Sequence, residues 1–324
     1  MEQPLLEVRD LHVSYAVYQG LLKVIDGVEF SVARREKVGV IGESGCGKTT
    51  TMKSIMRILA NNAVVEGGVI TYKDRDLMKI SSHDLTVLRR TSMSMIFQDP
   101  TAALNPVFKV GDQLQDVVRY SKLVGHNPTD KEVRSKAIEL LKAAALPEPA
   151  RILDSYPFQL SGGMRQRVCI ALSLASAQDL LIADEPGTSL DVTIEDQIMR
   201  LLKGIVEEKG LSVILITHSI GTAKGFVTKM LVMYAGTIVE ESPTEELFVN
   251  PLHPYTQLLL KAVPKLTGGG IPEGIGGRIP SYLSPPPGCR FVNRCPFAMT
   301  KCQSKPPFVH VGNGHKVACF LYGG

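Results

Sequence analysis

The stretch Gly42-Glu43-Ser44-Gly45-Cys46-Gly47-Lys48-Thr49 fills every fixed position of the phosphate-loop pattern G-x-x-x-x-G-K-[ST]. The apolar residues 38–41 precede it and predict a short buried strand. Residues 48–59 follow it with apolar side chains at helical spacing, namely Met52, Ile55, Met56 and Leu59. Strand, glycine-rich loop and helix therefore follow one another in the order that a nucleotide-binding loop requires.

The start of that helix explains why the loop can bind phosphate. It leaves backbone N–H groups unpaired and carries the positive end of the helix dipole, while Gly42, Gly45 and Gly47 keep side chains out of the way. Lys48 would bridge the terminal phosphates, and the Thr49 hydroxyl would ligate the accompanying Mg²⁺. The other residues expected to contact the nucleotide here are Ser44, Cys46 and Thr50. The sequence thus predicts a site for ATP and Mg²⁺.

Composition sets the broad class. The chain has 324 residues, of which 44% are hydrophobic and 21% charged, as expected for a soluble globular protein with one large domain and an appendage. No run approaches the ~18 to 20 apolar residues needed to span a bilayer, and the N-terminus lacks the pattern of a secretory signal. We therefore expect any work at a membrane to go through partner proteins.

The C-terminal quarter differs in composition from the rest. Residues 251–324 contain eight Lys or Arg and one acidic residue, a net charge of +7, so residues 1–250 carry −3 of the total +4. The same segment holds 11 of the 20 prolines and four of the six cysteines. This predicts a boundary near residues 248–254, with a main domain over 1–250 and a small, irregular extension over 251–324.

Polar residues directly follow three predicted buried strands, at 92–97, 180–183 and 213–217. These polar residues are Gln98, then Asp184 with Glu185, and His218. Two carboxylates at a strand end suit a magnesium-binding aspartate and a residue that polarises water. Alternating strands and helices with polar residues at the strand ends predict an α/β fold, with a largely parallel sheet and a site along its carboxyl edge.

Two further features could contact a nucleotide. Ser161-Gly162-Gly163 precedes an apolar helix predicted at 168–175, so Ser161 is expected to cap a helix start and the glycines to expose N–H groups to an anion. Tyr15 ends the strand predicted at 5–14, where its ring could stack on adenine or simply pack.

Together these motifs resemble the ATP-binding cassette subunits of ABC transporters. The resemblance covers residues 5–245 and rests on residues 42–49, Gln98, residues 160–166, Asp184-Glu185, Ser189-Leu190-Asp191 and His218. It implies the P-loop NTPase cassette fold. That fold has a mainly parallel core sheet, an N-terminal antiparallel β part and a helical subdomain at about 102–178.

The resemblance also implies roles for single residues. Tyr15 would be the adenine platform, and Gln98 would sense the γ-phosphate, help to ligate Mg²⁺ and contact the membrane subunit. Asp184 would bind Mg²⁺ through water. Glu185 would be the general base for the hydrolytic water, and His218 would hold that water and the γ-phosphate in line. Hydrolysis would thus depend on these residues and Lys48.

The resemblance further implies a dimer of cassettes, because one chain carries one half of each site. Ser161, Gly162, Gly163 and Asp191 would contact ATP held by a second cassette, which is either a paralogue or another copy of the chain. The sequence departs from the family at Gly187-Thr188-Ser189, where a threonine pair is common. We expect altered loop flexibility there, with activity retained.

A narrower resemblance points to the peptide and nickel importer branch, carried by residues 97–106, residues 250–256 and the cysteine-rich tail. It implies an ATPase at the cytoplasmic face of the membrane, powering uptake through two permease subunits fed by an extracellular solute-binding protein. Peptides are the expected cargo, and oligosaccharides or nickel stay open. The rival class is a soluble ABC ATPase acting on ribosomes or nucleic acid. Such proteins usually have two cassettes or a coiled-coil insertion, so no nucleic acid partner is expected.

The tail cysteines predict a metal centre. Cys289, Cys295, Cys302 and Cys319 are separated by 5, 6 and 16 intervening residues, in a segment with too little apolar periodicity for its own core. Without an export signal, disulfides are disfavoured, and four thiolates suit zinc or an iron–sulfur cluster. The lack of C-x₂-C pairs argues against a zinc ribbon, and Pro296 after Cys295 is similar to cysteine-proline ligation in ferredoxins.

The family resemblance favours a [4Fe–4S] cluster, with zinc, free thiols and a redox-responsive regulatory role as alternatives. Three histidines are possible substitute ligands, namely His253, His310 and His315. Cys46 and Cys169 are expected to be small packing residues.

Overall fold

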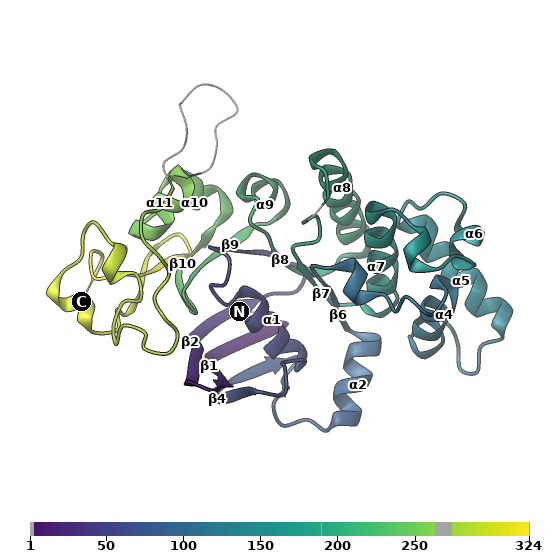
Figure 1. Ribbon diagram of the computed structural model, residues 1–324, viewed down its shortest axis with the longest axis horizontal. Coiled ribbons are helices and arrows are strands. Elements are labelled where there is room, and N and C mark those ends of the chain that lie inside the picture. The colour runs from purple at the N-terminus through teal and green to yellow at the C-terminus, as the bar shows by residue number, and fades with distance from the viewer. Residues whose placement is uncertain (1–2, 189, 263–273, 324) are drawn as a thin grey trace. The chain divides into compact units, whose positions relative to one another are not determined.

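The computed structural model describes residues 3–188, 190–262 and 274–323. The chain forms two compact units, one made of residues 1–79 and 216–324 and the other of residues 80–215 (Figure 1). The first unit thus contains both the predicted phosphate loop and the C-terminal extension.

An antiparallel sheet in the first unit is built from the N-terminal strands. In spatial order β2-β1-β4-β5, these are β2 Gly20–Val32, β1 Leu6–Val17, β4 Ala63–Tyr72 and β5 Arg75–Asp76. The fully buried side chains of β1 include Leu6, Val8, Leu11 and Val13. A β-bulge between Val8 and Leu11 shifts the register, so apolar residues on both sides of it face the core. The strand predicted at 5–14 is confirmed.

A second set of strands in the first unit joins central and C-terminal residues. In spatial order these are β11 Phe308–Gly312, β12 His315–Ala318, β10 Thr237–Pro243, β9 Lys229–Tyr234 and β3 Lys37–Ile41. β3 and β9 are parallel and almost wholly buried, as expected for an apolar parallel pair. The C-terminal hairpin pairs antiparallel with β10, Val317 lying opposite Glu240. The expectation of an irregular extension is wrong here, because long-range pairing leaves little local sequence signal.

The helices of the first unit are α1 Lys48–Met56, α9 Ile220–Phe226, α10 Thr244–Val249 and α11 Pro254–Lys261, with short 3₁₀ turns η2 Val292–Arg294 and η3 Thr300–Gln303. α1 ends three residues before the predicted end at Leu59. Arg57 adopts the left-handed conformation with φ of 52° and its N–H bonds back to the last turn, which closes the helix.

The second unit contains three strands, β8 Ser212–Ile216, β7 Leu180–Asp184 and β6 Met93–Ile96, in that spatial order. β6 and β7 are parallel, with Ile96 opposite Ala183. Its helical segments are α2 Ser82–Thr91, α3 Pro100–Ala103, α4 Val110–Tyr120, α5 Asp130–Ala143, α6 Pro149–Leu153, η1 Pro157–Gln159, α7 Gly162–Ser176 and α8 Val192–Lys209.

Helices α4, α5, α6 and α7 pack against one another (Figure 1). α5 begins at Asp130, where Thr129 and Glu132 form a capping box. None of the helices in the described ranges has the length and apolar character required to cross a bilayer.

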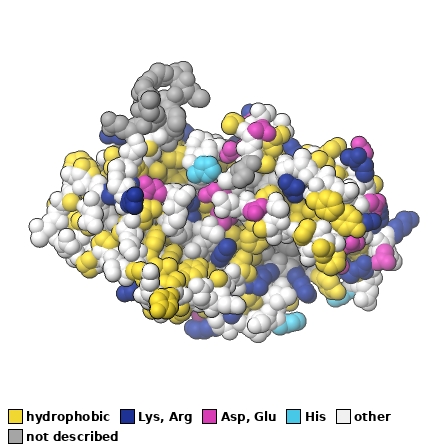
Figure 2. Space-filling model, in the orientation of Figure 1, with side chains coloured by type: hydrophobic (Ala, Val, Ile, Leu, Met, Phe, Trp, Pro, Cys, Tyr) yellow, Lys and Arg dark blue, Asp and Glu magenta, His cyan; other side chains and the backbone are white. Residues whose placement is uncertain are grey.

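One face of the molecule is drawn with its side chains in Figure 2. On this face of the described residues, Lys and Arg side chains lie among Asp, Glu and hydrophobic side chains.

Candidate nucleotide-binding site

The loop at residues 42–49 connects β3 to α1 as the sequence predicts. Gly42, Gly45 and Gly47 have φ angles of 152°, 78° and 106°, which glycine adopts at little cost. A Cβ atom at Gly42 would collide with the backbone carbonyl of Met233 on β9. Glycine is therefore needed there both for its backbone angle and for the close approach of the neighbouring strand.

Lys48 is held over this loop. Its residue is 5% exposed, and its Nζ donates to the Gly42 carbonyl at 2.8 Å and to the Glu43 carbonyl at 3.1 Å. Thr49 and Thr50 are half-buried in the first turn of α1. A cation fixed beside a helix start, with two hydroxyls next to it, can neutralise a polyphosphate and complete the shell of a metal ion.

The two cysteines outside the tail are buried thiols. Burial raises the pKa of Cys46, which is fully buried within the loop, and raises the pKa of Cys169 on α7 to about 12. A thiol with a raised pKa is a poor nucleophile. Both side chains therefore pack as predicted.

In the second unit, Gln98 and Glu185 meet. Gln98 follows β6 and Glu185 follows the parallel β7, and the Gln98 Nε2 donates to Glu185 Oε2 at 2.9 Å. The Thr188 hydroxyl donates to the same oxygen at 2.9 Å. Asp184, at the end of β7, is 2% exposed. The sequence did not predict the hydrogen bond from Thr188 to Glu185, although Thr188 lies in the loop that departs from the family pattern.

Ser161 begins α7 as expected, because its Oγ accepts a hydrogen bond from the Met164 N–H at 3.3 Å. Asp191 caps α8 in the same way, accepting from the Ile194 N–H at 2.9 Å. A Cβ atom at Gly163 would lie 2.9 Å from the Ile194 side chain. The small residues at the start of α7 therefore let α8 pack closely against it.

The remaining predicted residues lie in the first unit. Tyr15 is half-buried on β1, opposite Leu22 and Ala63, and His218 is exposed between β8 and α9. The predicted meeting of residues 42–49 and His218 with Gln98, Asp184 and Glu185 joins the two units and stays a prediction.

Comparison with known proteins decides the family. Residues 25–188 match the family described as ABC transporter. The chain belongs to the ABC transporter family. Residues 239–302 of this ABC protein also match the C-terminal region of oligopeptide and dipeptide transporters, so the resemblance seen in the sequence is confirmed.

The ABC protein is similar over nearly its whole length to curated relatives. It is 42% identical to a putative peptide import ATP-binding protein of Brucella abortus, covering 98% of this chain and 94% of the relative. It is also 42% identical to the dipeptide transport ATP-binding protein of Bacillus subtilis, covering 98% and 95%. It is 40% identical to the oligopeptide transport ATP-binding protein of Salmonella typhimurium, covering 98% of this chain and 93% of the relative.

Solved structures support the cassette fold. A dimeric ATP-binding cassette, MJ0796, in a post-hydrolysis state bound to ADP and phosphate is 27% identical, with a TM-score of 0.65 over 74% of this chain and 98% of that one. A second dimeric structure of the same cassette also has a TM-score of 0.65 and is 28% identical. The chain is therefore an ATPase with the ABC cassette fold.

The four tail cysteines of this ABC ATPase line one small cavity of about 10 Å³ in the first unit. They are Cys289, Cys295, Cys302 and Cys319. The Cys289 N–H donates to the Cys302 carbonyl at 2.9 Å, and burial raises the pKa of Cys289 to about 11. Across the residues that the structure describes, no three or more His, Cys, Asp or Glu side chains are grouped so as to hold a metal ion. The metal centre stays a prediction.

Two of the three candidate histidines have other structural roles. His253 lines the cysteine cavity, but its Nδ1 accepts from the Tyr255 N–H at 3.1 Å and so caps α11. His315 pairs with buried Glu240, with 2.7 Å between Nε2 and Oε1. These bonds make His253 and His315 structural residues in the described chain.

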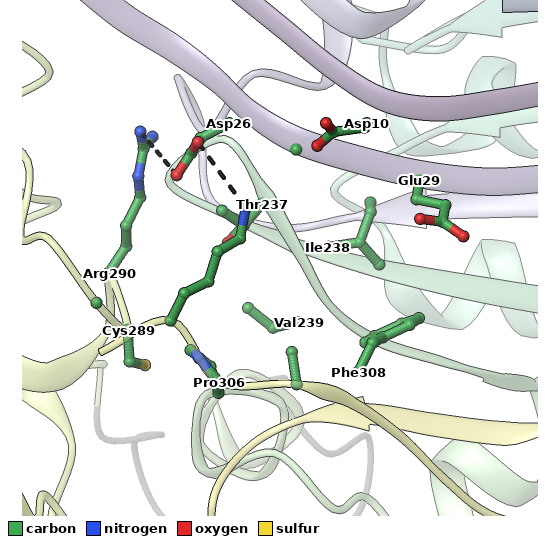
Figure 3. A pocket seen from close by; sticks show the side chains of 14 residues that line it. Asp10, Asp26, Glu29, Thr237, Ile238, Val239, Cys289, Arg290, Pro306 and Phe308 are labelled. Atoms are coloured by element: carbon green, nitrogen blue, oxygen red, sulfur yellow. Dashed lines mark ion pairs between the residues drawn. The ribbon is translucent and has the colours of Figure 1, made fainter. Parts of the chain in front are cut away.

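A larger cavity of about 220 Å³ lies in the same unit, between the N-terminal strands and the extension (Figure 3). Figure 3 shows Arg290 pointing toward Asp26, and their Nη2 and Oδ2 atoms are 3.5 Å apart. Asp10, Glu29 and Cys289 also line this cavity. Cys289 therefore borders both cavities.

Proposed function

We propose that this ABC ATPase powers the import of di- and oligopeptides. The observation that carries the proposal is the match of residues 239–302 to the C-terminal region of oligopeptide and dipeptide transporters. The solved cassette MJ0796 is matched over 98% of its length, but the match covers only 74% of this chain. About a quarter of this chain therefore has no counterpart in that cassette. Relatives that span both parts are named for peptide, dipeptide and oligopeptide transport.

ATP and Mg²⁺ are bound by the phosphate loop together with polar residues at the strand ends. The loop residues are Gly42, Ser44, Gly45, Cys46, Gly47, Lys48, Thr49 and Thr50. Thr49, Gln98 and Asp184 hold Mg²⁺, and Tyr15 supports the adenine. The buried position of Lys48 over the loop supports this assignment.

Glu185 is the general base, and His218 holds the γ-phosphate and the attacking water in line. Support comes from the two hydrogen bonds that Gln98 and Thr188 donate to the Glu185 carboxylate at 2.9 Å. These bonds fix the carboxylate, which a general base requires because proton transfer needs a defined geometry. They also connect the base to Gln98, the proposed γ-phosphate sensor.

Two cassettes work as a dimer, in which Ser161, Gly162, Gly163 and Asp191 of one contact ATP held by the other. Support comes from the exposure of Ser161 at the start of a 15-residue helix, where N–H groups and the dipole favour an anion. The matched solved cassettes are dimeric. The second cassette is another copy or a paralogue.

Membrane permease subunits dock on the surface near Gln98, fed by an extracellular solute-binding protein, which places the ATPase at the cytoplasmic face of the membrane. Support comes from apolar side chains exposed around this segment, with Phe97 38%, Val107 71% and Phe108 51% exposed. Large apolar side chains exposed on one segment of the chain suit contact with another protein.

Residues 251–324 form a functional extension to the nucleotide-binding domain at 1–250, and its four cysteines hold a [4Fe–4S] cluster. Support comes from the cavity that all four line. Zinc is the second choice, because the four cysteines lack the C-x₂-C pairs of a zinc ribbon. The cluster would supply a cross-link for a segment poor in core residues.

Co-purification tests the proposed function. The full chain, tagged and recovered from its own membranes in mild detergent, is expected to carry two permease subunits and a second cassette. Recovery with ribosomes or nucleic acid and without permeases would support the rival class and contradict the importer.

A further inference from the structure

The C-terminal extension reaches back to the phosphate loop within the first unit. Arg294 makes a two-pronged ion pair with Glu43, with Nη1 to Oε2 at 2.7 Å and Nη2 to Oε1 at 2.9 Å. The two residues are 251 positions apart in the sequence. The Arg294 side chain is only 5% exposed and that of Glu43 25%. Bidentate arginine–carboxylate pairs are strong and fix the geometry of both partners.

Two tyrosines of the extension hold the same loop by its backbone. The Tyr255 hydroxyl, on α11, accepts from the Glu43 N–H at 2.9 Å, and the Tyr282 hydroxyl donates to the Gly45 carbonyl at 2.7 Å. Tyr282 is itself tied to β2, because its carbonyl accepts from the Lys23 N–H at 2.8 Å. The extension thus contacts the loop at Glu43 and again at Gly45.

Arg294 is itself firmly fixed. Its Nε donates to the Gly276 carbonyl at 2.7 Å and its Nη2 to the Ile275 carbonyl at 3.0 Å. The guanidinium also lies 5.7 Å from the ring centre of Tyr234. An arginine guanidinium stays protonated in proteins, so the side chain keeps its charge. A guanidinium held by this many contacts can fix its carboxylate partner.

The position of Glu43 matters for a polyphosphate. Its carbonyl accepts from Lys48 Nζ at 3.1 Å, so a shift of Glu43 would move a partner of the phosphate-binding lysine. Its carboxylate would also repel phosphate oxygens if it were not neutralised. Arg294 meets both needs, because it pins the side chain and cancels its charge.

We propose that Arg294 is a positioning residue for ATP binding, holding Glu43 and with it the phosphate loop in the receptive conformation. The extension is then part of the nucleotide site of its own chain. This inference rests on the proposed assignment of residues 42–49 as the ATP site.

Equilibrium binding of a fluorescent ATP analogue with Mg²⁺ to the full-length chain tests the proposal. Arg294→Gln is expected to raise the Kd at least about fivefold and to raise KM for ATP more than it lowers kcat. In a Glu43→Gln background, Arg294→Gln should raise the Kd by less than about twofold, because the ion pair through which Arg294 acts is already broken. Lys316→Gln is the matched control, since Lys316 Nζ pairs with Glu241 Oε1 at 3.2 Å and links the extension to β10 without contacting the loop.

A Kd for Arg294→Gln within twofold of the Lys316→Gln value would overturn the proposal. A rise in Kd on adding Arg294→Gln to the Glu43→Gln variant that is as large as the rise in the unaltered chain would also overturn it, because Arg294 would then not act through Glu43. If Arg294→Gln does not fold, Arg294→Lys replaces it, with an expected rise of at least about twofold and the same control. The Lys48→Ala variant distinguishes a failure of the proposed ATP site from a failure of the role of Arg294. If Lys48→Ala binds the analogue normally, the ATP site itself is overturned. If Lys48→Ala loses binding while Arg294→Gln binds normally, only the role of Arg294 is overturned.

Discussion

Glu185 combines a strained backbone conformation with a side-chain carboxylate that is held by hydrogen bonds. Its φ of 47° lies in the left-handed region, which costs a non-glycine residue on the order of 1 to 3 kcal/mol. Its carboxylate receives hydrogen bonds from Gln98 and Thr188. A conformation that is costly and yet fully supported by neighbours is typical of a functional position.

Replacing Glu185 by Gln tests its role as general base. ATP binding should persist, because the amide keeps the size of the side chain, while phosphate release should fall at least about tenfold, since general-base catalysis contributes 10² to 10⁴. Both are measured on the purified chain, with Glu208→Gln on the exposed surface of α8 as the control. Near-normal phosphate release would remove Glu185 from the proposed role.

Residue contacts differ in how far the sequence predicts them. The meeting of Gln98 with Glu185 follows from two adjacent parallel strands that end at the same edge. The bond from Thr188 depends on the path of a loop that departs from the family pattern. The pair of Arg294 with Glu43 spans 251 positions, and no local pattern marks either partner.

Among the secondary structure elements, α7 begins at residues that both cap the helix and form the proposed contact with ATP of a second cassette. Ser161 accepts the Met164 N–H, and Gly163 allows the close approach of α8. This helix start was predictable, because a serine followed by glycines and an apolar run is a local signal. The pairing of β12 with β10 was not, because a short strand acquires its partner only in the folded chain.

Two substitutions of Ser161 separate capping from contact with a second cassette. Ser161→Ala should lower the free energy of unfolding by about 1 kcal/mol, because a cap is lost. Ser161→Asp should keep that free energy, since aspartate also caps helices and suits the dipole, but should abolish ATP-dependent dimerisation by repelling phosphate. Denaturant unfolding and sedimentation with ATP measure the two effects. Normal dimerisation of Ser161→Asp would place α7 outside the dimer interface.

At the scale of the whole molecule, the C-terminal extension is integrated into the unit that carries the phosphate loop. Its hairpin extends the strands of that unit, and Arg294 and Tyr282 contact the loop. Composition predicted a separate segment there, since charge, proline and cysteine all change near residue 250. It could not predict the attachment, which depends on single buried side chains.

Metal analysis tests whether the four cysteines of the extension hold a [4Fe–4S] cluster. Protein purified without oxygen should contain about four iron and four sulfide per chain and absorb broadly near about 400 nm. Cys302→Ser should lose most of the iron. Cys169→Ser, at a buried cysteine on α7, should retain it and serves as the control. Zinc in place of iron would contradict the cluster.

ATP-driven peptide uptake into vesicles tests the central claim most directly. The complete importer, reconstituted with its solute-binding protein facing the peptide and ATP on the side of the ATPase, should accumulate a labelled oligopeptide. With the Glu185→Gln subunit, accumulation should fall with phosphate release, by at least about tenfold. Steady ATP hydrolysis without peptide uptake, or uptake that is unaffected by Glu185→Gln, would contradict the account.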